Sequence, residues 1–217
     1  KAKYILKPGG TLGDLYTNSD LVYNDDGYIE VDKNGNVAVK DDYMDDIYLG
    51  SVFPKYNLAW RNDFNYKGIN LGVLFTARIG GICYSATQAN MDLYGVSEAS
   101  AAARDAGGVM INGRDMIDAQ KWYQVIGSQS GLPQYYTYSA TNVRLQELSL
   151  GYTLPSKWFR DKMRMTVSFV GRNLWMIYCK APFDPEAVAS TGMNYQGIDY
   201  FMMPSMRNLG FNVKFQF

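Results

Sequence analysis

The last ten residues of the chain alternate strictly between apolar and polar positions. Every second residue from Leu209 to Phe217 is apolar, and the residues between them are polar or glycine. A period of two is typical of a β-strand with one apolar and one hydrated face. Chain ends usually fray, so an uninterrupted strand that ends on an aromatic residue favours a closed membrane barrel.

Four earlier segments show the same alternation. They begin near Tyr56, Ile69, Val143 and Met163, and the second runs for eleven residues to Ile79. Strands of soluble proteins average about 5–6 residues, whereas tilted membrane strands need about 9–11. The third segment changes parity near Glu147, which predicts a β-bulge there. The pattern therefore predicts an all-β protein with about five antiparallel strands.

The connections between these strands alternate between short and long. Short turns are expected at Lys67 and at 155–161, and long loops at 81–140 and 173–205. Outer-membrane barrels have short periplasmic turns and long extracellular loops, so the two long segments should lie outside. Within 81–140, Ser97 and Asp118 are expected to cap helices over 98–106 and 119–126.

Residues 1–55 are polar and rich in turn residues. Asn34-Gly35 lies between two alternating runs, which predicts a hairpin. The run that begins at Asp32 also resembles the start of a calcium loop, but Val37 and Tyr43 stand where that motif needs glycine and glutamate. We therefore expect no metal site here.

Composition excludes several classes of function. Lys plus Arg and Asp plus Glu both number 21, so the basic excess of a nucleic-acid binder is missing. No run of about 18 apolar residues exists, which excludes a helical membrane protein. The chain has no histidine, the commonest general base and metal ligand, so we expect neither an enzyme nor a cofactor. Cys83 and Cys179 could form one disulfide or remain two thiols.

The 18 Tyr, 10 Phe and 4 Trp suit either a membrane-interface belt or a carbohydrate-binding surface. Trp60, Tyr66, Tyr152 and Trp158, near strand ends, are expected in the belt. Alternation alone would also fit a soluble sheet that covers a core, which could serve as a glycan-binding or adhesion domain. Strand length and loop asymmetry favour the membrane barrel.

Several segments resemble the C-terminal part of the SusC/RagA family of TonB-dependent outer-membrane transporters from Bacteroides-type bacteria. Residues 92–98 are similar to the starch-utilisation SusC branch in particular. The segments that carry the family resemblance are 7–10, 13–16, 140–152, 170–175, 181–186 and 197–204.

The resemblance implies a 22-stranded barrel in the bacterial outer membrane that imports glycans with a SusD-like surface lipoprotein. Peptides are the alternative cargo, because the family includes peptide importers. Residues 1–217 would be a C-terminal segment of the barrel, with the plug, the TonB box and an N-terminal domain elsewhere in a longer protein. Phe215 and Phe217 would supply the aromatic signal for membrane insertion.

Two groups of residues are candidates for substrate binding. Arginines at the polar positions of the strands would face the lumen of the barrel, although they could instead pair with carboxylates of the plug or keep the wall hydrated. Aromatic and acidic residues of the long loops suit sugar recognition, although they could instead pack the loop or dock a partner. The candidates are Arg78, Arg144, Arg172, Trp122, Tyr123, Tyr136, Asp184 and Tyr195.

Overall fold

The computed structural model describes residues 2–42, 46–160, 162–189, 192 and 195–217. The chain divides into two compact units. We call residues 54–81, 139–187 and 203–217 the sheet unit, and residues 1–53, 82–138 and 188–202 the mixed unit.

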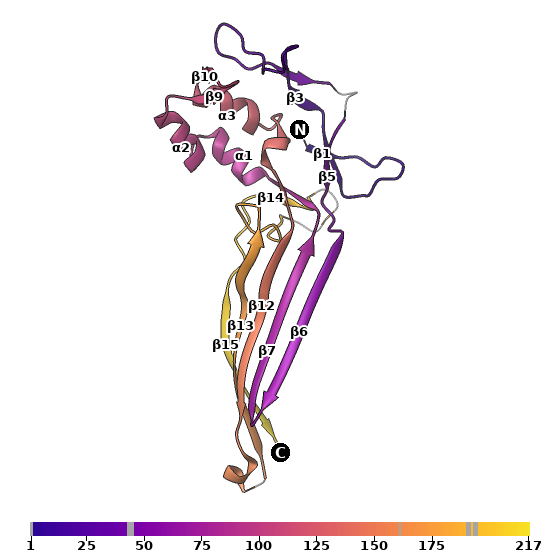
Figure 1. Cartoon of the computed structure of the whole chain (residues 1–217), viewed down its shortest axis with the longest axis vertical. Coiled ribbons are helices and arrows are strands. Elements are labelled where there is room, and N and C mark those ends of the chain that lie inside the picture. The colour runs from indigo at the N-terminus through magenta and orange to yellow at the C-terminus, as the bar shows by residue number, and fades with distance from the viewer. Residues whose placement is uncertain (1, 43–45, 161, 190–191, 193–194) are drawn as a thin grey trace. The chain divides into compact units, whose positions relative to one another are not determined.

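The sheet unit contains a five-stranded sheet in the order β15-β13-β12-β7-β6, with every neighbouring pair antiparallel. Figure 1 shows these long strands side by side. The sheet confirms the five strands expected from the sequence. Their bounds are β6 Tyr56–Tyr66, β7 Ile69–Ile79, β12 Asn142–Thr153, β13 Arg164–Cys179 and β15 Asn208–Gln216.

Short connections gather at one end of this sheet. Lys67 and Gly68 both have positive φ, at 45° and 88°, as a two-residue hairpin turn requires. The Thr153 amide donates to the Gly68 carbonyl at 2.7 Å, which places the end of β12 beside this turn. The single-turn helix η2 (Ser156–Phe159) follows Thr153. The long segments leave from the opposite end, where Tyr56 pairs with Ile79 and Asn142 pairs with Cys179.

The two faces of the sheet differ in polarity. Residues directly opposite each other share a face, so Phe211, Phe169, Leu150, Leu71 and Phe64 form one apolar row across all five strands. Phe211 is 81% exposed, because none of the described residues covers its side chain. An uncovered apolar face of this extent is expected for a surface that contacts lipid.

The bulge predicted near Glu147 is confirmed. The register of β12 shifts between Leu145 and Glu147 against both of its neighbours, and Gln146 is the extra residue against β7. A strand without this bulge would place Leu145 and Glu147 on the same face. The bulge instead sends Leu145 to the apolar face and Glu147 to the polar face.

The last long loop begins later than the sequence predicted. Strand β13 continues to Cys179, so residues 173–179 belong to the strand and not to the loop. The alternation breaks at Asn173, which has a positive φ of 52°, and two register shifts against β12 follow it along β13. Because of these irregularities, the second half of β13 lacks the two-residue alternation that predicts a strand.

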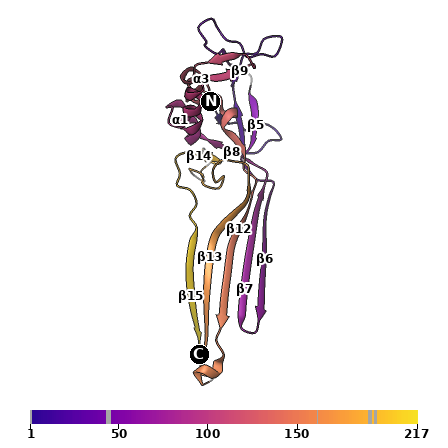
Figure 2. The ribbon, with the colours of Figure 1, turned by 60° about the vertical axis from the view of Figure 1, so that its left-hand side comes forward.

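The mixed unit combines short strands with helices (Figure 2). Strand β2 (Asp14–Thr17) pairs with β1 (Ala2–Tyr4) and β5 (Ile47–Ser51), and β8 (Ile82–Ser85) pairs in parallel with β14 (Ile198–Asp199). The remaining elements are β3 (Ser19–Leu21), β4 (Val39–Asp41), β9 (Val109–Ile111), β10 (Asp115–Ile117), β11 (Thr137–Ser139), η1 (Pro133–Tyr136), α1 (Ala86–Leu93), α2 (Glu98–Asp105) and α3 (Ala119–Gly127).

Both predicted helices are confirmed within one residue. Ser97 and Asp118 cap α2 and α3, and each side chain accepts a hydrogen bond from the amide three residues later. Helix α1 was missed, although Ser85 and Gln88 have the spacing of a capping box. None of the helices in the described residues is long and apolar enough to cross a membrane.

The core of the mixed unit joins segments that are far apart in sequence. Leu21 and Val37 pack with residues of α1, α3 and the β9–β10 hairpin. The turn at Asn34-Gly35 is confirmed, because the Asp32 amide donates to the Asn36 carbonyl and the Gly35 amide donates to the Asp32 carbonyl. The N-terminal region, expected only to be rich in turns, is therefore part of a packed unit.

Candidate functional site

A chain of alternating charges crosses the polar face of the sheet. The Arg61 guanidinium contacts both carboxylate oxygens of Asp63, at 2.9 and 3.1 Å, and donates to Glu147 at 3.4 Å. The second carboxylate oxygen of Glu147 accepts from Nε of Arg172 at 3.0 Å. Glu147 thus lies between two arginines and connects β6, β12 and β13.

Two backbone features permit this network. The bulge at Gln146 turns Glu147 onto the polar face. Gly72 of β7 lies between Asp63 and Ser149, and a Cβ there would meet the Ser149 hydroxyl at 2.5 Å and an Asp63 oxygen at 2.8 Å. The missing side chain lets polar groups of the flanking strands approach each other over β7.

Arg144 and Asp184, two of the predicted site residues, form a buried ion pair. Their side chains are 4% and 8% exposed, and two parallel hydrogen bonds join them at 2.9 and 3.3 Å. The other donors of Arg144 reach Asn142, Asn173 and the Glu186 carboxylate. Arg144 therefore has no donor left for a ligand, and its contacts hold the segment after β13 onto β12.

Asp184 also joins the two arms of the last loop. Its carboxylate accepts hydrogen bonds from the Ser205 hydroxyl and from the amide of Glu186. Burial alone raises the pKa of the Asp184 carboxyl, but the hydrogen bonds from Arg144, Ser205 and the Glu186 amide outweigh burial and lower the pKa. The carboxylate is therefore ionised at neutral pH.

The other two luminal candidates have different surroundings. Arg78 of β7 is half-buried and lies opposite Asn57 and Asn142. The Arg172 side chain is 66% exposed, and Nε to Glu147 is the one contact recorded for it in the described residues, which leaves its two terminal amino groups as donors. Arg172 is thus better presented to a ligand than Arg144.

The aromatic candidates of the long middle loop belong largely to a core. Trp122 is 7% exposed and Tyr136 is 2% exposed, and both pack with Leu21 and Val37. Burial, with the Asp92 carboxylate nearby, raises the pKa of Tyr136, which keeps the phenol neutral. This position suits packing of the unit rather than contact with a sugar. Tyr123 is half-buried at a small cavity of about 190 Å³.

The remaining predicted residues are exposed. Tyr195 is 58% exposed in a turn before β14. Phe215 lies on the apolar face of β15, opposite Met165, and Phe217 follows the strand and is 99% exposed. The structure therefore brings Arg144 and Asp184 together, and among the described residues no contact with that pair is recorded for the other candidates.

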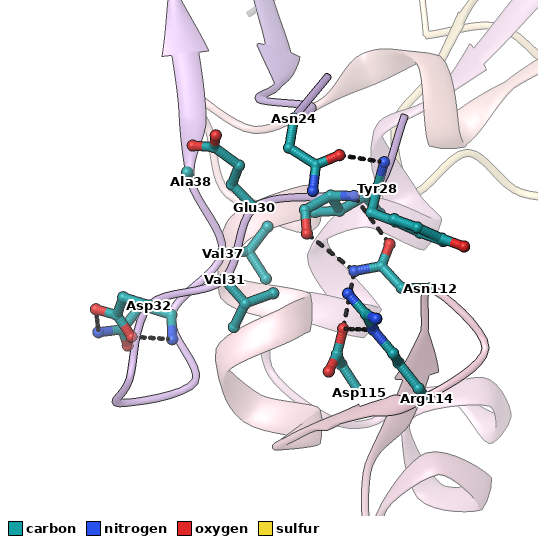
Figure 3. A pocket seen from close by; sticks show the side chains of 12 residues that line it. Asn24, Tyr28, Glu30, Val31, Asp32, Val37, Ala38, Asn112, Arg114 and Asp115 are labelled. Atoms are coloured by element: carbon teal, nitrogen blue, oxygen red, sulfur yellow. Dashed lines mark hydrogen bonds and ion pairs between the residues drawn. The ribbon is translucent and has the colours of Figure 1, made fainter. Parts of the chain in front are cut away.

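An open pocket lies in the mixed unit, between residues 24–38 and the turn of the β9–β10 hairpin (Figure 3). It has a volume of about 650 Å³. The Arg114 guanidinium lies over the Tyr28 ring, 4.8 Å from its centroid, and its Nε is 3.6 Å from the Asp115 carboxylate. Glu30 adds a further carboxylate to the lining.

Asn112 joins the two sides of this pocket. Its side-chain oxygen accepts from the Ile29 amide at 2.8 Å, and its side-chain nitrogen donates to the Ile29 carbonyl and to Asp115, both at 2.9 Å. Sequence reasoning missed this pocket. The available signal was Asn112-Gly113, a hairpin turn in which both residues have positive φ.

Within the described part of the chain, no group of three or more acidic or cysteine side chains could hold a metal ion. No disulfide is recorded there either, with Cys83 buried and Cys179 half-buried. Tyr43, which stands where a calcium loop needs glutamate, lies outside the described residues.

Comparisons with known proteins place this geometry in context. TonB-dependent receptor P3 of Formosa agariphila is 25% identical over 198 residues, which cover 87% of this chain and 19% of the receptor. No family model matches the chain.

Among solved structures, the RagAB peptide importer is similar in its closed-closed state, with a TM-score of 0.57 and 18% identity over 97% of this chain and 24% of that chain. Its open-open state gives a TM-score of 0.58 and is 16% identical, over 94% of this chain and 23% of the solved chain. The chain thus spans about a fifth of the receptor and a quarter of the solved chain. The chain is thus similar to part of a TonB-dependent receptor, and its fold is that of a β-rich segment of such an outer-membrane barrel.

Proposed function

We propose that the chain is a wall segment, with its outer loops, of a TonB-dependent transporter that imports oligosaccharides across the outer membrane. The two-faced sheet carries this proposal. Its apolar face is uncovered over five strands, and its opposite face holds a connected row of charged side chains. That division suits a wall with lipid on one side and a polar passage on the other.

The five strands need partners to form a passage. Strands β15 and β6 are the edges of the sheet, and unpaired edges are not tolerated in lipid. We propose that further strands of the same protein close the barrel around a plug. Energy for import would come from TonB, through residues outside this segment, so this segment would have no catalytic role.

A SusD-like lipoprotein is the proposed surface partner. The long connections all leave from one end of the sheet and include a packed unit with helices, which is more structure than a simple connection needs. We propose that this unit contacts the lipoprotein, and that exposed Tyr195 belongs to the contact or to the sugar path.

Oligosaccharides are the proposed cargo because exposed tyrosine and mixed polar groups occur together in the mixed unit. Peptides are the second candidate, because the similar solved structures are of a peptide importer. Within the passage, Arg172 is the proposed ligand-contacting arginine, while Arg144 with Asp184 would hold the loop base. Arg78 would line the wall. We further propose that Phe215 and Phe217 serve as an insertion signal.

Uptake by cells tests the proposal. A strain that lacks the full-length protein should fail to take up a fluorescent oligosaccharide on which the parent strain grows, and should take up a fluorescent octapeptide normally. Re-expression of the protein should restore uptake, and a protonophore should abolish it. Loss of octapeptide uptake alone would establish the peptide alternative, and unchanged uptake of both would reject an import function.

A further inference from the structure

We propose that the pocket between residues 24–38 and the β9–β10 turn binds a sugar unit of an oligosaccharide. The choice of ligand class rests on the proposed function, but the site itself is independent of the sheet's polar face. All lining residues belong to the mixed unit, whose own core holds them in place.

The pocket presents an aromatic ring for stacking. Tyr28 is 41% exposed, and the Arg114 guanidinium covers part of its ring at 4.8 Å from the centroid. Sugar rings have C–H surfaces that stack on aromatic faces, and a ring held by a neighbouring cation loses less freedom on binding. Figure 3 shows Tyr28 and Arg114 beside each other at one side of the pocket.

Hydrogen-bond acceptors and donors line the same pocket. No hydrogen bond or ion pair is recorded for the Glu30 carboxylate within the described chain, so both of its oxygens can accept. Arg114 uses Nε toward Asp115, which leaves its terminal amino groups as donors. A sugar hydroxyl can both donate and accept a hydrogen bond. The hydroxyls of one sugar can therefore bond to the Glu30 acceptor and to the Arg114 donors.

The pocket is preorganised by Asn112. This side chain makes two hydrogen bonds to the backbone of Ile29 and a third to Asp115, so one amide fixes both walls. Figure 3 shows Glu30 on the other side of the pocket from Tyr28 and Arg114, so a sugar bound between these two sides would meet side chains from both.

The backbone of this wall argues against a peptide ligand. A peptide that adds a strand needs unpaired amide and carbonyl groups. Here the amides of Tyr28, Ile29, Glu30 and Asp32 donate to Asn24, Asn112, Val22 and Asn36, respectively. Recognition at this wall must therefore use side chains, which favours a sugar over an extended peptide.

Binding by the purified full-length protein in detergent tests the proposal. The probes are neutral hexasaccharides built from glucose, mannose, galactose or fructose, and octapeptides with and without lysine. We expect at least one hexasaccharide to bind, with affinity about tenfold weaker or more for Tyr28→Ala and for Glu30→Gln. Tyr94→Ala, which changes a 75% exposed tyrosine outside the pocket, and Asp25→Asn should bind like the unmodified protein.

Three other outcomes would reject the proposed sugar site. It is rejected if no hexasaccharide binds, if the pocket variants bind as tightly as the unmodified protein, or if octapeptides bind and the same variants weaken them. Each variant's mixed unit should resist trypsin like the unmodified protein, and Tyr28→Phe provides a folded variant that keeps the ring. Because uptake is measured in cells and binding on purified protein, a failed site and a failed import function give different results.

Discussion

Arg144 Nη2 lies 2.9 Å from one carboxylate oxygen of Asp184, and Arg144 Nη1 lies 3.3 Å from the other. A planar guanidinium that grips both oxygens is a strong and directional ion pair. This pair joins β12 to the segment after β13, and Ser205 adds the returning arm of the loop.

Removing one partner of this pair should destabilise the base of the loop. Arg144→Ala leaves the Asp184 carboxylate buried and unpaired, which costs about 3–5 kcal/mol in buried pairs. Arg172→Ala removes an arginine that is 66% exposed and should cost less than about 1 kcal/mol. Trypsin cleavage within residues 180–207 of the full-length protein should accelerate only for Arg144→Ala. Equal rates would show that the pair does not hold the loop.

The same pair predicts how the loop base responds to acid. The pKa of Asp184 is lowered in the folded protein from its ordinary value of 3.8. A lowered carboxyl pKa gives stability that is fully present above the ordinary value and is lost as pH falls through the lowered pKa. Protection of residues 181–187 from hydrogen exchange, taken relative to the intrinsic rate at each pH, should therefore stay high down to about pH 5 and fall below about pH 4. Asp184→Asn should remove this step, and a step that persists would assign it to another group.

Neighbouring residues of β15 should tolerate charge differently. Phe211 lies on the apolar face, opposite Phe169, and Asn212 lies on the polar face, opposite Ser168. Phe211→Arg places a charge in lipid and should cost about 2–4 kcal/mol near the bilayer midplane. Asn212→Arg should fold nearly normally. Heat-modifiable mobility of the full-length barrel in gels reports folding, and equal losses would refute the assignment of the faces.

Deleting Gln146 should impair folding of the barrel far more than substituting it does. The deletion removes the bulge and shifts either Glu147 or the residues before it to the opposite face. Gln146→Ala keeps the residue count and should leave the register intact. We expect little heat-modifiable barrel from the deletion and near-normal amounts from Gln146→Ala. A deletion variant that folds normally would mean that the bulge can move along β12.

Substitutions of Trp122 and Tyr195 should distinguish a residue that packs the core from a residue that is free to contact a ligand. Trp122 is 7% exposed in the core of the mixed unit, so Trp122→Ala should cost about 3–5 kcal/mol and expose residues 82–138 to proteases. Tyr195→Ala removes a 58% exposed ring and should leave protease resistance unchanged. If Trp122→Ala resisted proteolysis normally but weakened sugar binding, Trp122 would be a ligand residue after all.

The sheet could be predicted from sequence because its signal is local. Period two in β6, β7 and β15 gives the faces directly, and the parity change near Glu147 gives the bulge. The second half of β13 could not be predicted in this way, because the positive φ at Asn173 and two register shifts break the period. Helix α1 has a capping residue at Ser85, but its apolar residues do not follow a clear helical period, so the sequence held too little information to predict it.

The candidate site was harder to predict because it depends on pairs that are distant in sequence. Arg144 and Asp184 were each identified, but their 40-residue separation gave no sign that they neutralise each other. Trp122 and Tyr136 were expected near a ligand because of their chemistry, while the structure packs them against residues of the N-terminal region. Asn112 and Tyr28 are 84 residues apart, and only folding joins their two turns into one pocket.

The alternation of the sheet lets evolution change its two faces independently. A substitution on one face of β13 or β15 leaves the other face untouched, so the fit to lipid and the chemistry of the interior can drift separately. A single inserted or deleted residue exchanges the faces beyond it, unless a bulge such as that at Gln146 absorbs the change. Homologous chains should therefore vary in length within loops, and within strands only where such a bulge is gained or lost.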